Sequence, residues 1–103
     1  MADTHNHVLT FGVYADGNLV KTVEYTTESI TIGGGEAALL SLPGAGLAEL
    51  HAVINVQDDV SVQLLDLGSE VGTKLNNARI TNAAVSSGDE IGLGNVRITV
   101  NIT

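Results

Sequence analysis

The sequence contains no cysteine, a single proline, three aromatic residues and only four basic residues among 103. Without cysteine, the chain can form neither disulfide bonds nor zinc–thiolate sites, and it has no thiol nucleophile. With so few aromatic rings, its core has to be built from valine, isoleucine, leucine and alanine. No apolar run approaches the roughly 20 residues of a membrane-spanning helix, and the first residues lack the apolar stretch of a signal peptide. We therefore expect no direct insertion into a membrane.

The four lysines and arginines are outnumbered by 12 aspartates and glutamates, which gives a formal net charge of −8. A surface of this sign repels the phosphates of nucleic acids and the head groups of anionic lipids. We therefore expect no nucleic-acid partner. Because an acidic surface associates faster with a basic one, the charge favours a protein partner that has a basic surface.

What the sequence does contain is a series of short runs rich in β-branched residues, separated by turn signals. They predict strands at residues 7–14, 19–25, 29–32, 39–42, 51–57, 60–66, 74–76, 78–80, 83–85, 90–94 and 96–102. Two-residue turn signals such as Asp16-Gly17, Asp58-Asp59 and Gly94-Asn95 separate neighbouring runs. This spacing predicts an all-β sandwich of about ten short, mostly antiparallel strands.

The two least regular parts of the chain are its beginning and the segment before the central hairpin. Residues 1–6 are polar and are predicted to be a flexible N-terminus. Residues 47–50 form either a loop or a single helical turn. Residues 7–103 are expected to form one domain, since the length suits a single core and the chain contains no linker.

Six short motifs follow one another along the chain in a specific order and spacing. They are Ile32-Gly33, His51-Ala52, Leu65–Ser69, Gly72-Thr73, the segment 75–80 and the segment 87–94. With these motifs, the chain resembles the forkhead-associated (FHA) family over residues 19–100. The resemblance implies an eleven-stranded sandwich of the SMAD/FHA type, whose loops at one end bind phosphothreonine peptides. Such domains usually belong to longer polypeptides, so we expect residues 7–103 to be the N-terminal module of a larger protein.

The resemblance also separates residues of the scaffold from residues that read the phosphate. Gly33, His51 and Gly72 match positions with a structural role in the family, and Thr73 and Asn76 are kept as well. The phosphate-reading positions differ: the motif arginine is Gly34, the serine and second arginine are Ala48 and Glu49, and the asparagine is Val71. Each lost charge-assisted hydrogen bond costs about 1.5 to 3 kcal/mol, and Glu49 would repel a phosphate. The sequence therefore predicts that the fold is retained and the phosphothreonine site is lost.

We expect this domain to act as an interaction or scaffolding module that does not depend on phosphorylation. Its partner is another protein or another domain of the same polypeptide, and not a small-molecule substrate. The residues predicted to form the partner-binding loop face are Gly34, Leu47, Ala48, Glu49, Leu50, Ser69, Glu70, Val71, Thr73, Asn76 and Asn77. For its apolar members, ordinary anchoring of the loops is an equal alternative. A second hypothesis is weak phosphothreonine binding in which Lys74 or Arg79 replaces the lost arginine.

No pattern of residues favours an enzyme. Ser69 and Thr73 lie in a glycine-flanked loop that resembles a nucleophile turn, but no histidine or acid accompanies them in a catalytic order. His51 matches a buried histidine that braces the loops in the family. Asp3, His5 and His7 lie on the terminal segment, where a metal site is not expected. We expect no catalytic residue, metal or cofactor, and the resemblance to divergent bacterial FHA-like domains implies a cytoplasmic module of a membrane-associated assembly.

Overall fold

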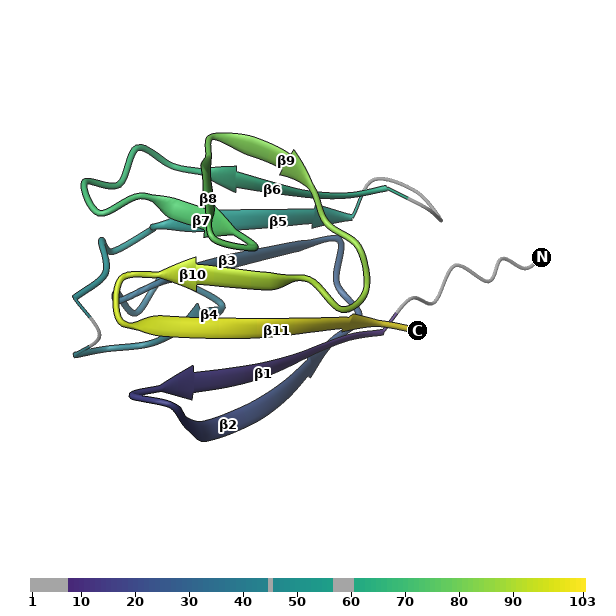
Figure 1. The fold of residues 1–103 in the computed structure, drawn as a ribbon, viewed down its shortest axis with the longest axis horizontal. Helices are drawn as coiled ribbons and strands as arrows, with labels where there is room; N and C mark the ends of the chain where they lie inside the picture. Colours follow the sequence, from purple (N-terminus) through teal and green to yellow (C-terminus); the bar gives the residue numbers. More distant parts are fainter. Residues whose placement is uncertain (1–7, 45, 57–60) are drawn as a thin grey trace.

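A computed structural model describes residues 8–44, 46–56 and 61–103, which form eleven strands in two sheets (Figure 1). The strands are β1 (Leu9–Ala15), β2 (Asn18–Tyr25), β3 (Ser29–Gly33), β4 (Leu40–Ser41), β5 (Ala52–Val56), β6 (Val62–Asp66), β7 (Thr73–Leu75), β8 (Ala78–Ile80), β9 (Asn82–Ala84), β10 (Glu90–Leu93) and β11 (Val96–Ile102). One sheet has the order β2-β1-β11-β10-β7-β8, and the other has the order β4-β3-β5-β6-β9. The β3–β4 pair is parallel, and the other strand pairs are antiparallel.

The predicted all-β sandwich is confirmed, and most strand boundaries differ by one or two residues. The strand predicted at 39–42 keeps only two residues, as β4, and it ends before Pro43 and the following glycine, which form a turn. Of the two alternatives for residues 47–50, the structure has a loop. The predicted flexible N-terminus at 1–6 and the Asp58-Asp59 turn both lie outside the described residues.

The core lies between the sheets and is almost entirely aliphatic, as the composition requires. In β11, Val96, Ile98 and Val100 are buried while Arg97 and Asn101 point outward, which is the alternation expected of a strand with one face in a core. The buried cluster comprises Leu9, Phe11, Val13, Ile30, Ile32, Leu40, Leu42, Ala52, Ile54, Val62, Leu64, Val85, Ile91, Leu93, Val96, Ile98 and Val100. Each such side chain contributes about 1.5 to 3 kcal/mol to folding when fully buried.

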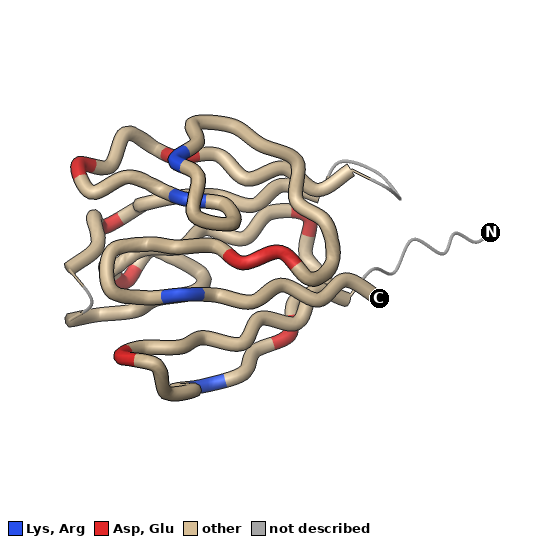
Figure 2. Tube along the Cα trace, in the orientation of Figure 1, with Lys and Arg blue, Asp and Glu red and all other residues tan. Residues whose placement is uncertain are grey.

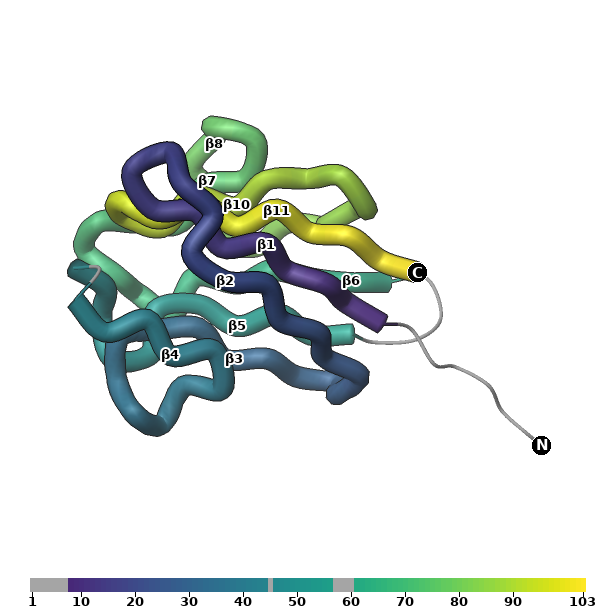
Figure 3. The backbone as a smooth tube through the Cα atoms, turned by 90° about the horizontal axis from the view of Figure 1, so that it is seen from below, coloured from purple at the N-terminus to yellow at the C-terminus, as the bar shows by residue number. Residues whose placement is uncertain are grey.

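The strands bring several connections together at one end of the sandwich, on the left of Figure 1. They are the β1–β2 and β10–β11 turns, the first residues of the β3–β4 connection, and the β4–β5 and β6–β7 loops. The carboxyl end of β11 lies at the opposite end, where Thr103 and Val8 exchange backbone hydrogen bonds of 3.1 and 3.2 Å. Figure 3 shows the two sheets edge on, with the same loops gathered at one side. We call the exposed surface of these connections the loop end.

Candidate interaction face

Two glycine-rich segments at the loop end are joined directly through their backbones. The amide of Gly34 donates to the carbonyl of Ala48 at 2.8 Å, and the amide of Gly35 donates to that of Glu49 at 3.2 Å. Gly33 allows this approach, because a Cβ at this position would overlap the carbonyl group of Glu49. The amides of Gly34 and Gly35 are therefore used within the protein and do not point at a ligand.

His51 connects the same loops to the β6–β7 loop. Its side chain is fully buried. The Nε2–H group donates to the carbonyl of Gly72 at 2.9 Å, while Nδ1 accepts a longer bond of 3.4 Å from the amide of Ala48. Only the tautomer with the proton on Nε2 makes both bonds. His51 thus ties together two loops that carry predicted site residues.

Asp66, which the sequence analysis did not single out, organises the β6–β7 loop. Its carboxylate accepts hydrogen bonds from the hydroxyls of Ser69 and Thr73 at 2.5 and 2.7 Å, and from the amides of Gly68 and Ser69 at 3.1 and 3.3 Å. The Ser69 hydroxyl in turn accepts the amide of Gly72 at 3.1 Å. An aspartate at a strand end followed by Gly-Ser is an Asx-turn signal, and it could have identified this cluster.

The Asp66 cluster turns the hydroxyls of two predicted partner-binding residues toward the inside of the loop. Thr73 is fully buried and the Ser69 hydroxyl faces Asp66, so both hydroxyls support the loop from inside. Asn76 and Asn77 form the β7–β8 turn with positive φ angles of 51° and 72°. Asn76 binds Asp89 through its Nδ2 group at 3.1 Å. The turn is therefore held against the β9–β10 connection and lies away from the loop end (Figure 1).

Because of the Asp66 cluster, we expect the free energy of unfolding to depend on pH in the acidic range. Burial raises the pKa of the Asp66 carboxyl, but the hydrogen bonds from Ser69, Thr73 and Gly68 outweigh burial and hold the pKa below its ordinary value of 3.8. The unfolded chain therefore binds this proton first as the pH falls. The stabilisation by Asp66 is complete above pH 3.8 and is lost as the pH falls through the folded-state pKa.

Asp66→Asn should lower the free energy of unfolding at neutral pH by about 1 to 2 kcal/mol, because an amide cannot accept all of these bonds. It should also flatten the loss of stability with pH on the acid side. Urea denaturation of both proteins between pH 7 and pH 2 measures the two effects. Parallel acid profiles for the two proteins would contradict this role of Asp66.

The surface of the loop end is apolar and acidic. Leu50 and Val71 are 42% and 52% exposed, and Leu47 is half-buried against the core. Together with Gly46, Ala48, Gly68, Ser69 and Glu70, Leu47 and Val71 line a shallow depression between the β4–β5 and β6–β7 loops. Four connections carry one carboxylate each and no lysine or arginine, namely Asp16, Glu36, Glu49 and Glu70 (Figure 2). A phosphate at this depression would face carboxylates and no cationic side chain of the loops.

The two cations considered as substitutes for the lost arginine lie on a neighbouring hairpin. Lys74 and Arg79 are directly opposite each other on β7 and β8. The guanidinium of Arg79 lies against the backbone of Gly72, since a Cβ on Gly72 would be 2.6 Å from its Nε atom. Arg79 therefore contacts the end of the β6–β7 loop, and Lys74 lines a hollow that Val71 and Gly72 of the same loop also line.

The fold and this loop end define a β-sandwich that presents loops to another molecule. The family model of the FHA domain matches residues 30–94, well over half of the chain, so the chain belongs to the FHA family. This confirms the resemblance found in the sequence. FHA domains are interaction modules, not enzymes.

Individual relatives agree with this membership. The chain is 34% identical over 82 residues to the FHA domain-containing protein FhaA of Mycobacterium tuberculosis, which covers 80% of this chain but only 15% of that relative. A solved FHA domain from work on phosphothreonine-dependent FHA domain interactions is 32% identical, with a TM-score of 0.78, covering 95% of this chain and 97% of that one. The FhaA FHA domain complexed with the intracellular domain of Rv3910 is 33% identical, with a TM-score of 0.75, covering 92% and 99%.

In the part of the chain that the structure describes, no helix is long and apolar enough to cross a membrane.

Proposed function

We propose that this FHA domain binds another protein, or another domain of the same polypeptide, through the loop end and without a phosphothreonine. The observation that carries the proposal is the depression beside Ala48 and Val71. It is bordered by Glu70, and none of the loops around it carries a cation. The apolar side chains of Leu50 and Val71 offer contact area, and the carboxylates of Glu49 and Glu70 favour a basic rim on the partner.

The backbone geometry supports the same proposal. A phosphate needs donors that are free to bind it. The amides of Gly34 and Gly35 are already bonded to the β4–β5 loop, and the hydroxyls of Ser69 and Thr73 are bonded to Asp66. The carboxylates repel a phosphate, and the loops offer it few free hydrogen-bond donors. A phosphopeptide would therefore gain less binding free energy here than a protein surface that is apolar and basic.

Titration with a phosphothreonine peptide library tests the proposal. We expect no shift of the loop resonances of the native chain, and we expect binding once the family groups are restored by Gly34→Arg, Ala48→Ser, Glu49→Arg and Val71→Asn together. A Cβ at Gly34 would lie 3.0 Å from the carbonyl oxygen of Leu47, a contact that a small loop movement relieves. Phosphate-dependent binding by the native chain would overturn the proposal.

The interaction face itself is tested with the intact protein as bait. Val71→Asp places a charge at the centre of the exposed apolar surface and should abolish capture of the partner, and Leu50→Asp should weaken it. Val20→Asp is the matched control, because Val20 is 60% exposed but lies on the edge strand β2. Equal capture by Val71→Asp and the native bait would exclude the loop end as the contact.

Weak phosphothreonine binding is a second candidate, favoured by the position of the Arg79 guanidinium against Gly72. If it is correct, the native chain binds a phosphothreonine peptide and Arg79→Ala or Lys74→Ala abolishes the binding. Insensitivity to both substitutions removes this candidate, whatever the affinity.

A further inference from the structure

Three of the four cations of the chain lie in one line across the outer face of the six-stranded sheet. Lys74 is opposite Arg79 on one side and opposite Gly92 on the other, and Gly92 is opposite Arg97. Residues that are directly opposite each other in a sheet point to the same face. Because Ile91 and Leu93 are buried, Gly92 and its partners face outward. We call Arg79, Lys74 and Arg97 the basic row.

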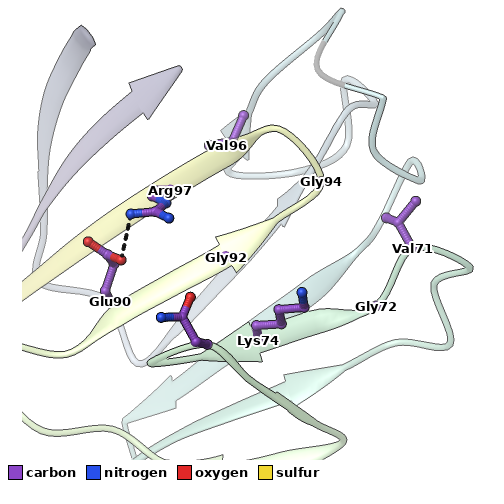
Figure 4. Close-up of a pocket in the computed structure, with 9 residues that line it drawn as sticks. Val71, Gly72, Lys74, Glu90, Gly92, Gly94, Val96 and Arg97 are labelled. Carbon is purple, nitrogen blue, oxygen red and sulfur yellow. Dashed lines mark hydrogen bonds and ion pairs between the residues drawn. The ribbon is translucent and has the colours of Figure 1, made fainter. Parts of the chain in front are cut away.

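A hollow of about 180 Å³ lies at the centre of this row (Figure 4). Gly92 is its floor, with Lys74 on one side and Arg97 on the other. The hollow is also lined by Asn77, Glu90, Gly94 and Val96, and it reaches Val71 and Gly72 at the end of the β6–β7 loop. The hollow exists because Gly92 has no side chain: a Cβ there would meet only the Cβ of Lys74, at 3.6 Å.

The cations of the row are only partly neutralised within the protein. Arg97 forms an ion pair of 3.2 Å with Glu90. Neither Lys74 nor Arg79 forms an ion pair with a carboxylate of the residues that the structure describes. Although the net charge is −8, three of the four cations are grouped on this sheet, with Glu90 beside Arg97, whereas the connections of the loop end carry carboxylates and no lysine or arginine (Figure 2).

We propose that the basic row binds an extended acidic segment of a protein, with one carboxylate seated over Gly92 between Lys74 and Arg97. From Arg79 to Arg97 the row crosses three strand spacings, roughly 14 Å, which an extended segment of about five residues spans. Alternate residues of such a segment point to the same side, so that successive carboxylates reach successive cations. A nucleic acid is disfavoured because a long polyanion would extend beyond the row onto acidic surface. This surface adjoins the loop end at Val71, which lines both depressions, but its cations and its proposed ligand go beyond the function proposed for the loops.

The test is titration of the isotopically labelled chain at low ionic strength with a blocked oligoglutamate peptide long enough to span the row. The amide resonances of Lys74, Gly92 and Arg97 should shift. Replacing Lys74 and Arg97 together by alanine should weaken binding about tenfold. Lys21→Ala should leave binding unchanged, although it also removes a positive charge, because Lys21 is opposite the buried Val13 and does not share the outer face.

Two further variants distinguish binding in the hollow over Gly92 from nonspecific electrostatic attraction. Gly92→Val keeps every charge and suits a strand, but it fills the floor of the hollow, so it should abolish binding while leaving the fold intact. Glu90→Gln removes the carboxylate that competes for Arg97 and should tighten binding. Shifts confined to the loops, equal weakening by Lys21→Ala, unchanged binding by Gly92→Val, or equal occupation by inorganic phosphate would each overturn the proposal.

Discussion

Replacing His51 by alanine is expected to lower the free energy of unfolding by about 3 to 4 kcal/mol. The substitution leaves a cavity at a fully buried position, and it leaves the carbonyl of Gly72 without the bond that it accepts from Nε2 at 2.9 Å. A cavity of this kind costs about 2 to 4 kcal/mol, and an unpaired buried carbonyl costs about 1 to 3 kcal/mol. Relaxation of the two loops recovers part of this sum.

Chemical denaturation at constant pH measures the effect, with Leu50→Ala as the control. Leu50 directly precedes His51 but is 42% exposed, so its truncation should change stability by about 0.5 kcal/mol or less. The amide resonances of Ala48 and Gly72 should also broaden in the His51 variant, because the loops lose their common attachment. If the two variants were equally stable, His51 would not be a brace.

Gly33→Ala is the second substitution with a large expected effect. A Cβ at Gly33 would overlap the carbonyl of Glu49, and backbone atoms cannot move aside as a flexible side chain can. The β3–β4 and β4–β5 segments must separate, and the hydrogen bonds of Gly34 and Gly35 to this loop are then weakened. We expect a loss of about 2 to 3 kcal/mol, since two hydrogen bonds and the packing around them are disturbed.

Gly92→Ala provides the matched control for this prediction. It is the same substitution in another strand, where the new Cβ would make one ordinary contact of 3.6 Å with Lys74. Removing a glycine from a strand at a compatible position stabilises a protein by about 0.4 to 1 kcal/mol. Thermal denaturation of the two variants should therefore move the midpoint in opposite directions. A Gly33→Ala protein as stable as the native chain would show that the close approach of the two loops is not required.

The two proposed surfaces have opposite chemistry. The loop end is apolar with an acidic rim, whereas the basic row lies on the outer face of the six-stranded sheet and is lined by Lys74 and Arg97. Under the two proposals, the domain binds a basic protein at its loops and an acidic segment at the outer face of the six-stranded sheet. Leu50→Asp and Gly92→Val affect one surface each, because Leu50 does not line the hollow over Gly92, so these variants separate the two proposed functions in the intact protein.

The sequence predicted the fold because its strands and turns depend on local information. Alternation along a strand such as β11 follows from a period of two residues, and turn signals follow from the conformational preferences of glycine, aspartate and asparagine. Gly34, Ala48 and Val71 were recognised as changed by their place in motifs. Their place in these motifs was enough to predict that they lie in the loops, without any interatomic distance.

What the sequence by itself determined is therefore the class of sandwich, its strand order along the chain and the chemical character of its loops. Only the tertiary structure decided that Thr73 points inward to Asp66, that Asn76 is held by Asp89 away from the loop end, and that Lys74 and Arg97 flank one glycine. These contacts join residues on different strands, and the pairing register that aligns them is fixed by burying all strands around one core.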